Sequence, residues 1–436
     1  MRSFVLILTI GCLLPSCLFY PQVGMLVWGW LTLMSPHQEV YGLAQALQFN
    51  LVVAVVTLLA WLVSAEPKVP PGSAVLSAFI LFVLLMGVSQ LTAALPDYSF
   101  TFFDRFIREM VFIFLCLAML NSKARIHAML WIYAISIGYF AVKGGAFTLV
   151  SGGGYHVVGP PNSMIGDNNH IGLAVVMALP VMNYLRLQTA NRPLRTGIVL
   201  AMVLSFICVL GTQSRGAFIG LAAMGLVLIW RSRHRTLSLV VIAAMAIPMV
   251  MFMPETWVER METIGSATDD NSFNARVQAW WIAVYIALGD PLTGVGFRAG
   301  YIQSVADMFT GGGYVARAHH SIYFEILAAM GFLGLAVYLL IMFLTWRNAA
   351  RVRRLARDRR GLEWAHDLAS MAQATLAGYI VAGASMSVEF WAGYWLFVPI
   401  LLHLRRLVEA EVVVGADAPS TALRRGPATA ALEPRR

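Results

Sequence analysis

Charged residues are scarce in this chain. Only 12% of its 436 residues are Asp, Glu, Lys or Arg, whereas 59% are hydrophobic. Soluble domains carry about 25% charged residues, so this composition excludes an ordinary water-soluble enzyme. The mean hydropathy of +0.72 indicates that the bilayer is the solvent for most of the chain.

Cysteine is also rare, and its placement excludes two further classes of protein. The four cysteines lie inside apolar stretches without paired spacing (Cys12, Cys17, Cys116 and Cys208). This pattern supports neither a disulfide framework nor a cysteine metal site. Residues 1–34 begin with an apolar stretch but contain no small-residue cleavage site, so we expect no cleaved signal peptide.

Apolar runs long enough to cross a hydrocarbon core of ~30 Å as helices recur along the whole chain. They predict an all-α, polytopic membrane protein with about twelve transmembrane helices. Residues 21–34 are short for a span and Pro21 breaks a continuous helix, so twelve or thirteen crossings remain open. The expected spans are 3–20, 21–34, 46–64, 72–93, 104–120, 125–143, 169–186, 195–212, 214–230, 236–253, 321–346, 367–385 and 390–407.

The net charge of +9 is concentrated in short loops, which argues against nucleic acid as a partner. Basic clusters at 231–235 and 347–360 predict cytoplasmic loops and contacts with membrane lipids. By alternation, loops 94–103 and 144–168 and the long segment 254–320 then face the periplasm. The predicted organisation is N-terminal transmembrane helices (1–253), a periplasmic loop with short helices (254–320), C-terminal transmembrane helices (321–410) and a disordered cytoplasmic tail (411–436).

Two arginines on the predicted periplasmic face are candidate phosphate ligands. Arg215 follows an apolar span in the string Gly211 to Gly216, and Arg276 lies one turn before Trp280 in a helical stretch of the long loop. Guanidinium groups match phosphate oxygens bidentately. An interfacial anchor for Arg215 and a solvated surface side chain for Arg276 are the alternatives, and the sequence leaves both open.

His320 is the candidate general base. It opens a predicted span, where the helix dipole disfavours protonation of an imidazole, and a neutral imidazole accepts a proton from a hydroxyl. Its neighbour His319 lies about 100° round a helix, so only one of the pair points into a given site. No cluster of Asp, Glu or Cys accompanies the histidines, and we therefore expect no metal.

Taken together, these strings resemble the O-antigen ligase family over roughly residues 200–345. The resemblance is carried by Ser214-Arg215-Gly216, Arg276 before Trp280, Pro291 to Phe297, and His320-Ser321-Ile322-Tyr323 leading to Gly331-Phe332-Leu333-Gly334. Upstream, Lys143-Gly144-Gly145 and Gly159 to Asn169 resemble a bacterial subgroup of O-glycosylation ligases. Ser321 stands where the family more often has Asn, and Met330 where it has an acidic residue or His, which bears on acceptor contacts.

The resemblance implies a glycosyltransferase of the bacterial inner membrane with its active site facing the periplasm. It would move O-antigen polysaccharide from an undecaprenyl-pyrophosphate-linked donor to lipid A–core in lipopolysaccharide assembly, with inversion and without metal, nucleotide or other cofactor. Arg215 and Arg276 would bind the pyrophosphate and His320 would activate the acceptor hydroxyl, supported by His319, Tyr323 and Ser214. An O-antigen polymerase or a protein O-oligosaccharyltransferase would share the donor, and a lipid or solute transporter is a more distant alternative.

Overall fold

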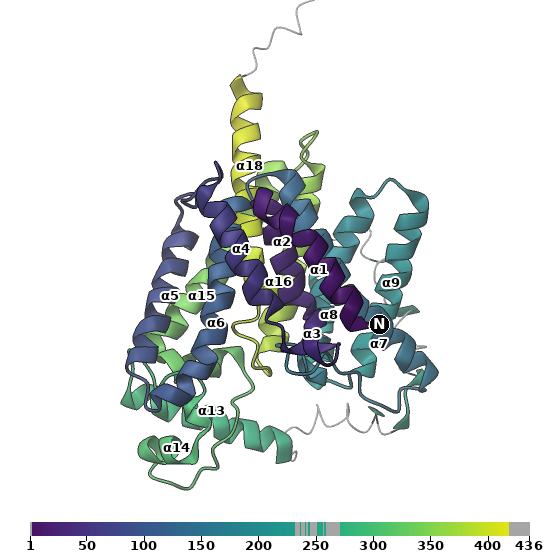
Figure 1. Ribbon diagram of the computed structural model, residues 1–436. Coiled ribbons are helices and arrows are strands. Elements are labelled where there is room, and N and C mark those ends of the chain that lie inside the picture. The colour runs from purple at the N-terminus through teal and green to yellow at the C-terminus, as the bar shows by residue number, and fades with distance from the viewer. Residues whose placement is uncertain are drawn as a thin grey trace, which may run out of the picture.

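A computed structural model of the chain describes residues 2–231, 236, 240, 243–244, 251–255, 257–258 and 271–417 (Figure 1). These residues form helices and connections and contain no strand, so the all-α prediction is confirmed for them. In chain order the elements are α1 (Arg2–Phe19), α2 (Pro21–Met34), η1 (Pro36–Gln38), α3 (Leu43–Ala46), α4 (Phe49–Val63), α5 (Ala74–Leu91), α6 (Pro96–Met119), α7 (Lys123–Val150), α8 (Asn168–Gln188), α9 (Arg192–Gly211), α10 (Arg215–Arg231), α13 (Asn271–Gly289), η3 (Ala299–Tyr301), α14 (Gln303–Thr310), α15 (Ile322–Ala356), α16 (Glu363–Gly383), α17 (Ala392–Trp395) and α18 (Phe397–Asp417).

Six helices among the described residues are long and apolar enough to cross a membrane: α1, α5, α7, α8, α9 and α15. The helix α4 is apolar but shorter, and α2 has 14 residues, fewer than the ~20 of a typical span. The predicted span 236–253 falls largely outside the described residues. The count of about twelve crossings therefore stays a prediction.

The helices at the two ends of the chain can be compared with the predicted break at Pro21 and the predicted boundary at residue 411. The break at Pro21 is confirmed, because α1 ends at Phe19 and α2 begins at Pro21. At the other end, α18 continues to Asp417, past the point where the sequence predicted an irregular tail. The boundary at residue 411 is thus wrong for residues 411–417. Glu409 explains part of the extension, since it accepts hydrogen bonds from Arg351 in α15 (2.5 Å) and from Arg405 (2.9 Å).

The helix α8 lies at the centre of the bundle, packed against α7, α9, α10 and α16. Of its most apolar stretch, 78% is buried inside the protein. A group of buried aromatic side chains joins α15, α16 and α17. Tyr379 stacks on Tyr394 with ring centroids 4.2 Å apart, and the hydroxyls of Tyr338 and Tyr379 lie 2.7 Å apart. This packing joins α15, α16 and α17, and α16 in turn packs against α8.

The long helix α15 is broken at Gly331, whose φ of +64° is non-helical. The connection after α13 docks at this break. The backbone N–H of Val295 donates to Ala328 O (3.0 Å), that of Gly296 to Ala329 O (3.2 Å), and that of Phe332 to Pro291 O (2.8 Å). A Cβ on Gly331 would lie 2.5 Å from Pro291 O. Two segments that carry the family resemblance, Pro291 to Phe297 and Gly331 to Gly334, therefore contact each other.

The two ends of the bundle differ in character (Figure 1). The helices α13 and α14 lie at one end, and the basic connections between α4 and α5, α8 and α9, and α15 and α16 lie at the other. This separation is the arrangement that the distribution of Lys and Arg predicted. The first residues of α6 and α15 lie toward the end that carries α13 and α14.

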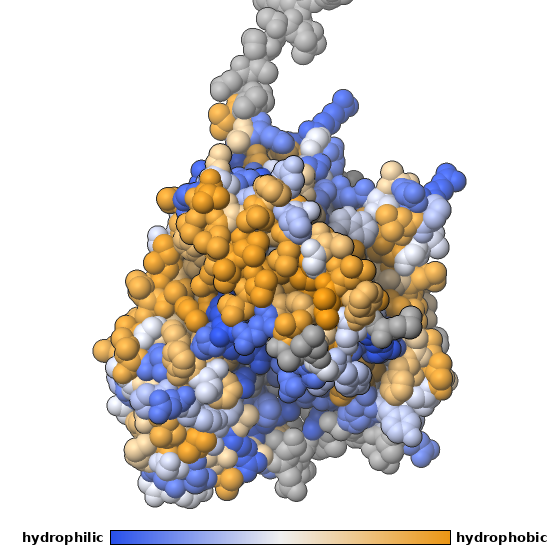
Figure 2. Space-filling model, viewed as in Figure 1, coloured by the Kyte–Doolittle hydropathy of each residue, from blue (hydrophilic) through white to orange (hydrophobic). Residues whose placement is uncertain are grey.

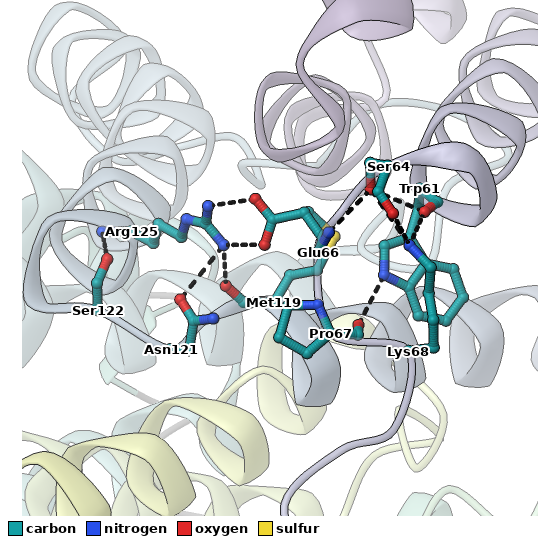
Figure 3. Close-up of polar contacts among 9 residues, drawn as sticks. All are labelled: Trp61, Ser64, Glu66, Pro67, Lys68, Met119, Asn121, Ser122 and Arg125. Atoms are coloured by element: carbon teal, nitrogen blue, oxygen red, sulfur yellow. Dashed lines mark hydrogen bonds and ion pairs between the residues drawn. The ribbon is translucent and has the colours of Figure 1, made fainter.

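Polar side chains join two connections at the basic end (Figure 3). The Arg125 guanidinium, at the start of α7, binds both carboxylate oxygens of Glu66 at 2.5 and 2.8 Å and donates to Met119 O at 3.0 Å. Lys68 caps the end of α4 by donating to Ser64 O at 2.6 Å. The hydrogen bond from Arg125 lowers the pKa of Glu66 below its usual value of 4.5.

We expect Glu66→Gln to lower the free energy of unfolding at pH 7 by about 1–3 kcal/mol, because Arg125 keeps its charge but loses a charged acceptor. A lowered carboxyl pKa stabilises the fold above the unfolded value, and this contribution is lost as the pH falls through the folded value. The difference in free energy of unfolding between Glu66→Gln and the unsubstituted protein should therefore shrink below pH 4.5. Unfolding in mixed detergent micelles at pH 7 and pH 4 measures it. Asp358→Asn, in an ion pair whose side chains are 73–78% exposed, is the control and should change little.

Candidate active site

His319 and His320 lie side by side in the chain but in different surroundings. They precede α15, for which Ser321 is the N-cap residue. His320 has a φ of +48°, a left-handed conformation that His adopts more readily than most residues. This turn buries His319, which is 1% exposed, and leaves His320 half-buried. The prediction that only one of the pair is presented to a site agrees with this arrangement.

His319 belongs to a buried network centred on Glu325. Its Nδ1 lies 3.4 Å from Glu325 Oε2, and Glu325 Oε1 accepts hydrogen bonds from the hydroxyls of Tyr301 (2.5 Å) and Ser387 (2.6 Å). The Trp280 indole donates to the backbone oxygen of His319 at 2.8 Å. The network fixes the backbone on which His320 stands.

The helix α13 brings Arg276 to the start of α15. Trp280, one turn after Arg276, stacks on Phe324 with ring centroids 5.1 Å apart and planes 9° from parallel. Burial and, next, the positive charge of Arg276 lower the pKa of His320 below its usual value of 6.5, against the opposing charges of Glu325 and Asp167. His320 is therefore neutral at pH 7. Burial and the charge of Arg276 favour this neutral form, in addition to any effect of the helix dipole.

Arg215 begins α10, against the first turn of α8. The Ser214 hydroxyl donates to Asn169 Oδ1 at 2.7 Å and accepts from the N–H of Ala217 at 3.2 Å. The Asn168 side-chain amide donates to Thr212 O at 2.9 Å. These bonds pin the α9–α10 turn, so Ser214 holds the helix start that carries Arg215.

Tyr323 has a packing role rather than a place in this network. Its hydroxyl donates to Ile380 O in α16 at 2.9 Å. Tyr323 therefore ties α15 to α16 just beyond the histidines. Its predicted support of the site can act through this contact between helices.

Several polar residues besides the predicted site residues lie close to the histidines. A cavity of about 370 Å³ is lined by Asp167, His170, Arg298 and Ser387, together with Arg105. The Arg298 guanidinium lies 4.7 Å from the Phe102 ring centroid. The one signal in the sequence was the charge of Arg105 inside the predicted span 104–120, because charged residues within spans are commonly functional.

Glu389 is a further buried acid of this region, in the connection between α16 and α17. It is 1% exposed. Burial and, next, the charge of Glu325 raise the pKa of Glu389 to about 8. Glu389 is therefore mostly protonated at pH 7, and Glu325 is the other buried carboxyl group that interacts electrostatically with nearby Arg298.

Comparison with known proteins matches two parts of the chain to family models. Residues 200–339 match the O-antigen ligase family, and this range contains Arg215, Arg276 and His320. Residues 1–190, which contain Arg105 and His170, match a family of unknown function (DUF5935). No curated protein matches the chain. The family suggests a glycosyltransferase-like ligase activity, and together with the apolar helices it indicates a membrane protein. The domain at residues 200–339 supports assigning the chain to the O-antigen ligase family.

Proposed function

We propose that this protein transfers O-antigen polysaccharide from undecaprenyl pyrophosphate to lipid A–core at the periplasmic face of the bacterial inner membrane. The observation that carries the proposal is a neutral, half-buried His320 beside Arg276 at the start of α15, inside the O-antigen ligase domain. A neutral imidazole next to a guanidinium is suited to deprotonating one substrate while the other, an anion, is held nearby.

In this mechanism His320 accepts the proton of an acceptor hydroxyl. The oxygen attacks the anomeric carbon of the donor sugar from the face opposite the pyrophosphate, a new glycosidic bond forms, and the bond to the pyrophosphate oxygen breaks. Undecaprenyl pyrophosphate leaves with the bonding electron pair. Arg215 and Arg276 stabilise the charge that develops on it, and the sugar carbon is inverted.

The acceptor is tested in cells and in a purified system. Deletion of the protein should remove polymer from lipopolysaccharide, and purified protein in nanodiscs should join a lipid-linked glycan to lipid A–core. Loss of glycan from glycoproteins with intact lipopolysaccharide would assign a protein acceptor. Elongation of the lipid-linked glycan itself would assign a polymerase.

The lowered pKa of His320 predicts the pH dependence of transfer. The rate should be constant near neutrality and fall only below pH 6.5, where the imidazole becomes protonated and can no longer accept a proton. Because the positive charge of Arg276 lowers this pKa, Arg276→Gln should move the acid limb of kcat/KM to higher pH, in addition to reducing the rate. An acid limb that stays at the same pH in Arg276→Gln would contradict the coupling between the two residues.

A further inference from the structure

Two cavities adjoin where α2, α4 and α6 meet. The outer cavity, of about 340 Å³, lies between these helices, and the inner one, of about 370 Å³, reaches Asp167 and His170. Arg105 and residues 162–164 line both. We call the two cavities together the passage. It leads toward His320, because His170 and Asp167 lie within electrostatic range of that residue.

The outer cavity is lined by both polar and apolar side chains. Leu51 and Val55 of α4, which are 43% and 46% exposed, lie at the rim. Three buried atoms of its lining have no hydrogen-bond partner among the described residues: His37 Nδ1, Asn50 Oδ1 and Glu109 Oε2. Figure 2 shows a hydrophilic patch within the apolar face beside α6. A cavity that holds polar groups and opens on an apolar face is suited to the polar head of an amphiphile.

Two guanidinium groups give the passage affinity for an anion. Arg105 donates from Nη2 to Asn162 O at 3.3 Å. Its other guanidinium N–H groups make no hydrogen bond within the described part of the chain. Arg298 lines the inner cavity and carries a buried Nε without a hydrogen-bond partner in the described part of the chain. Its φ of +57° is a conformation that needs support from its surroundings. Glu109 and Asp167 also line the passage, so its charge is mixed.

Nearby carboxyl groups offset part of this positive charge, because Glu325 interacts electrostatically with Arg298. Asp167 is engaged by the N–H of His170 at 2.7 Å, and Glu325 is engaged by Tyr301 and Ser387. Glu389 is mostly protonated at pH 7, as described above. A phosphate group offers several acceptor oxygens to guanidinium forks.

We propose that the passage binds the phosphate-bearing headgroup of a membrane lipid, which moves in from the bilayer between α2, α4 and α6, with Arg105 and Arg298 as phosphate ligands. The role of that lipid as a substrate rests on the proposed function. The donor and a lipid acceptor both carry phosphate, and a protein acceptor does not need this route.

Binding of a probe lipid tests the site without catalysis. Purified protein in detergent is titrated with undecaprenyl monophosphate, and bound lipid is measured by native mass spectrometry. The double variant Arg105→Gln/Arg298→Gln should bind the probe at least about tenfold more weakly. The control Arg317→Gln changes a partly exposed arginine outside the lining of the passage and should bind the probe as the unsubstituted protein does. Unchanged binding by the double variant would overturn the proposal. Equal binding of inorganic pyrophosphate, lost in the same variant, would instead reveal a soluble-anion site and overturn the lipid assignment.

Blocking the rim after folding distinguishes donor from acceptor. Leu51→Cys is labelled with a bulky maleimide in a Cys12→Ser background, since Cys12 is the exposed cysteine and the other three are buried. Leu59→Cys, on the same helix, 56% exposed and outside the lining, is the matched control.

A label at position 51 should lower kcat/KM about tenfold or more for the one lipid that uses the passage, and the label at position 59 should not. A raised KM for the donor alone or for the acceptor alone identifies that lipid, and normal transfer with a fully labelled Leu51→Cys contradicts the passage. If the unlabelled protein shows no transfer, the proposed function fails, and the binding experiment still decides the passage.

Discussion

Replacing His320 by alanine is expected to reduce the rate of transfer by about 10²–10⁴-fold, the usual contribution of a positioned general base. The protein should still fold, because the hydrogen bonds at the start of α15 are made by His319, Glu325, Tyr301 and Trp280. His320→Asn separates chemistry from backbone strain, since Asn also tolerates the left-handed conformation. Both variants should therefore lose activity to a similar extent. The measurement is the initial rate with purified protein, alongside the thermal unfolding temperature.

His319→Ala is the matched comparison on the neighbouring position. His319 is buried and contacts Glu325 and Tyr301, so its loss should lower the unfolding temperature and reduce transfer less than His320→Ala. Near-normal transfer by both His320 variants would rule out the assigned base. A greater loss of kcat in His319→Ala at an unchanged unfolding temperature would move the role of base to His319.

The helices could be predicted because their cause is local. Apolar length alone places α5, α7, α8, α9 and α15, and Pro21 separates α1 from α2. The break in α15 could not be predicted in the same way. Gly331 is tolerated inside many helices, and here its left-handed conformation is needed because residues 291–296 approach its backbone from a distant part of the chain.

The candidate site shows the same limit. Arg276 could be connected with His320 only through the family resemblance, and the structure supplies the physical link, the stacking of Trp280 on Phe324. Arg298 was not predicted as a site residue because the neighbouring glycines, Gly294 and Gly296, indicate only a turn. The cavity beside Arg298 forms only when α6, α8 and the α16–α17 connection meet. The helix-dipole argument for a neutral His320 gave the right direction, but the helix begins two residues later, at Ile322, and burial is the main cause.

The second large effect is expected at Arg215 and Arg276, which we propose act together on one pyrophosphate. Arg215 starts α10 beside the first turn of α8, and Arg276 stands on α13 beside His320. A pyrophosphate carries at least two negative charges, and two guanidinium groups can bind separate phosphate oxygens. Each charge-assisted bond contributes about 1.5–3 kcal/mol, so either alanine variant should lose about 10- to 100-fold in kcat/KM. Lysine retains the charge but not the bidentate fork, and Arg→Lys should also impair transfer at either position.

The double variant decides whether the two arginines form a unit. If both bind the same anion, Arg215→Ala/Arg276→Ala should be little worse than the worse single variant, because losses from residues that act together are not additive. The rates are compared above pH 7, where the altered pKa of His320 in Arg276→Ala no longer limits the proton transfer. Arg317→Ala, which changes a partly exposed arginine between α14 and α15, is the control for a general loss of positive charge and should transfer normally. Strictly additive losses would mean that Arg215 or Arg276 acts independently of the pyrophosphate, as an interfacial side chain that anchors its helix.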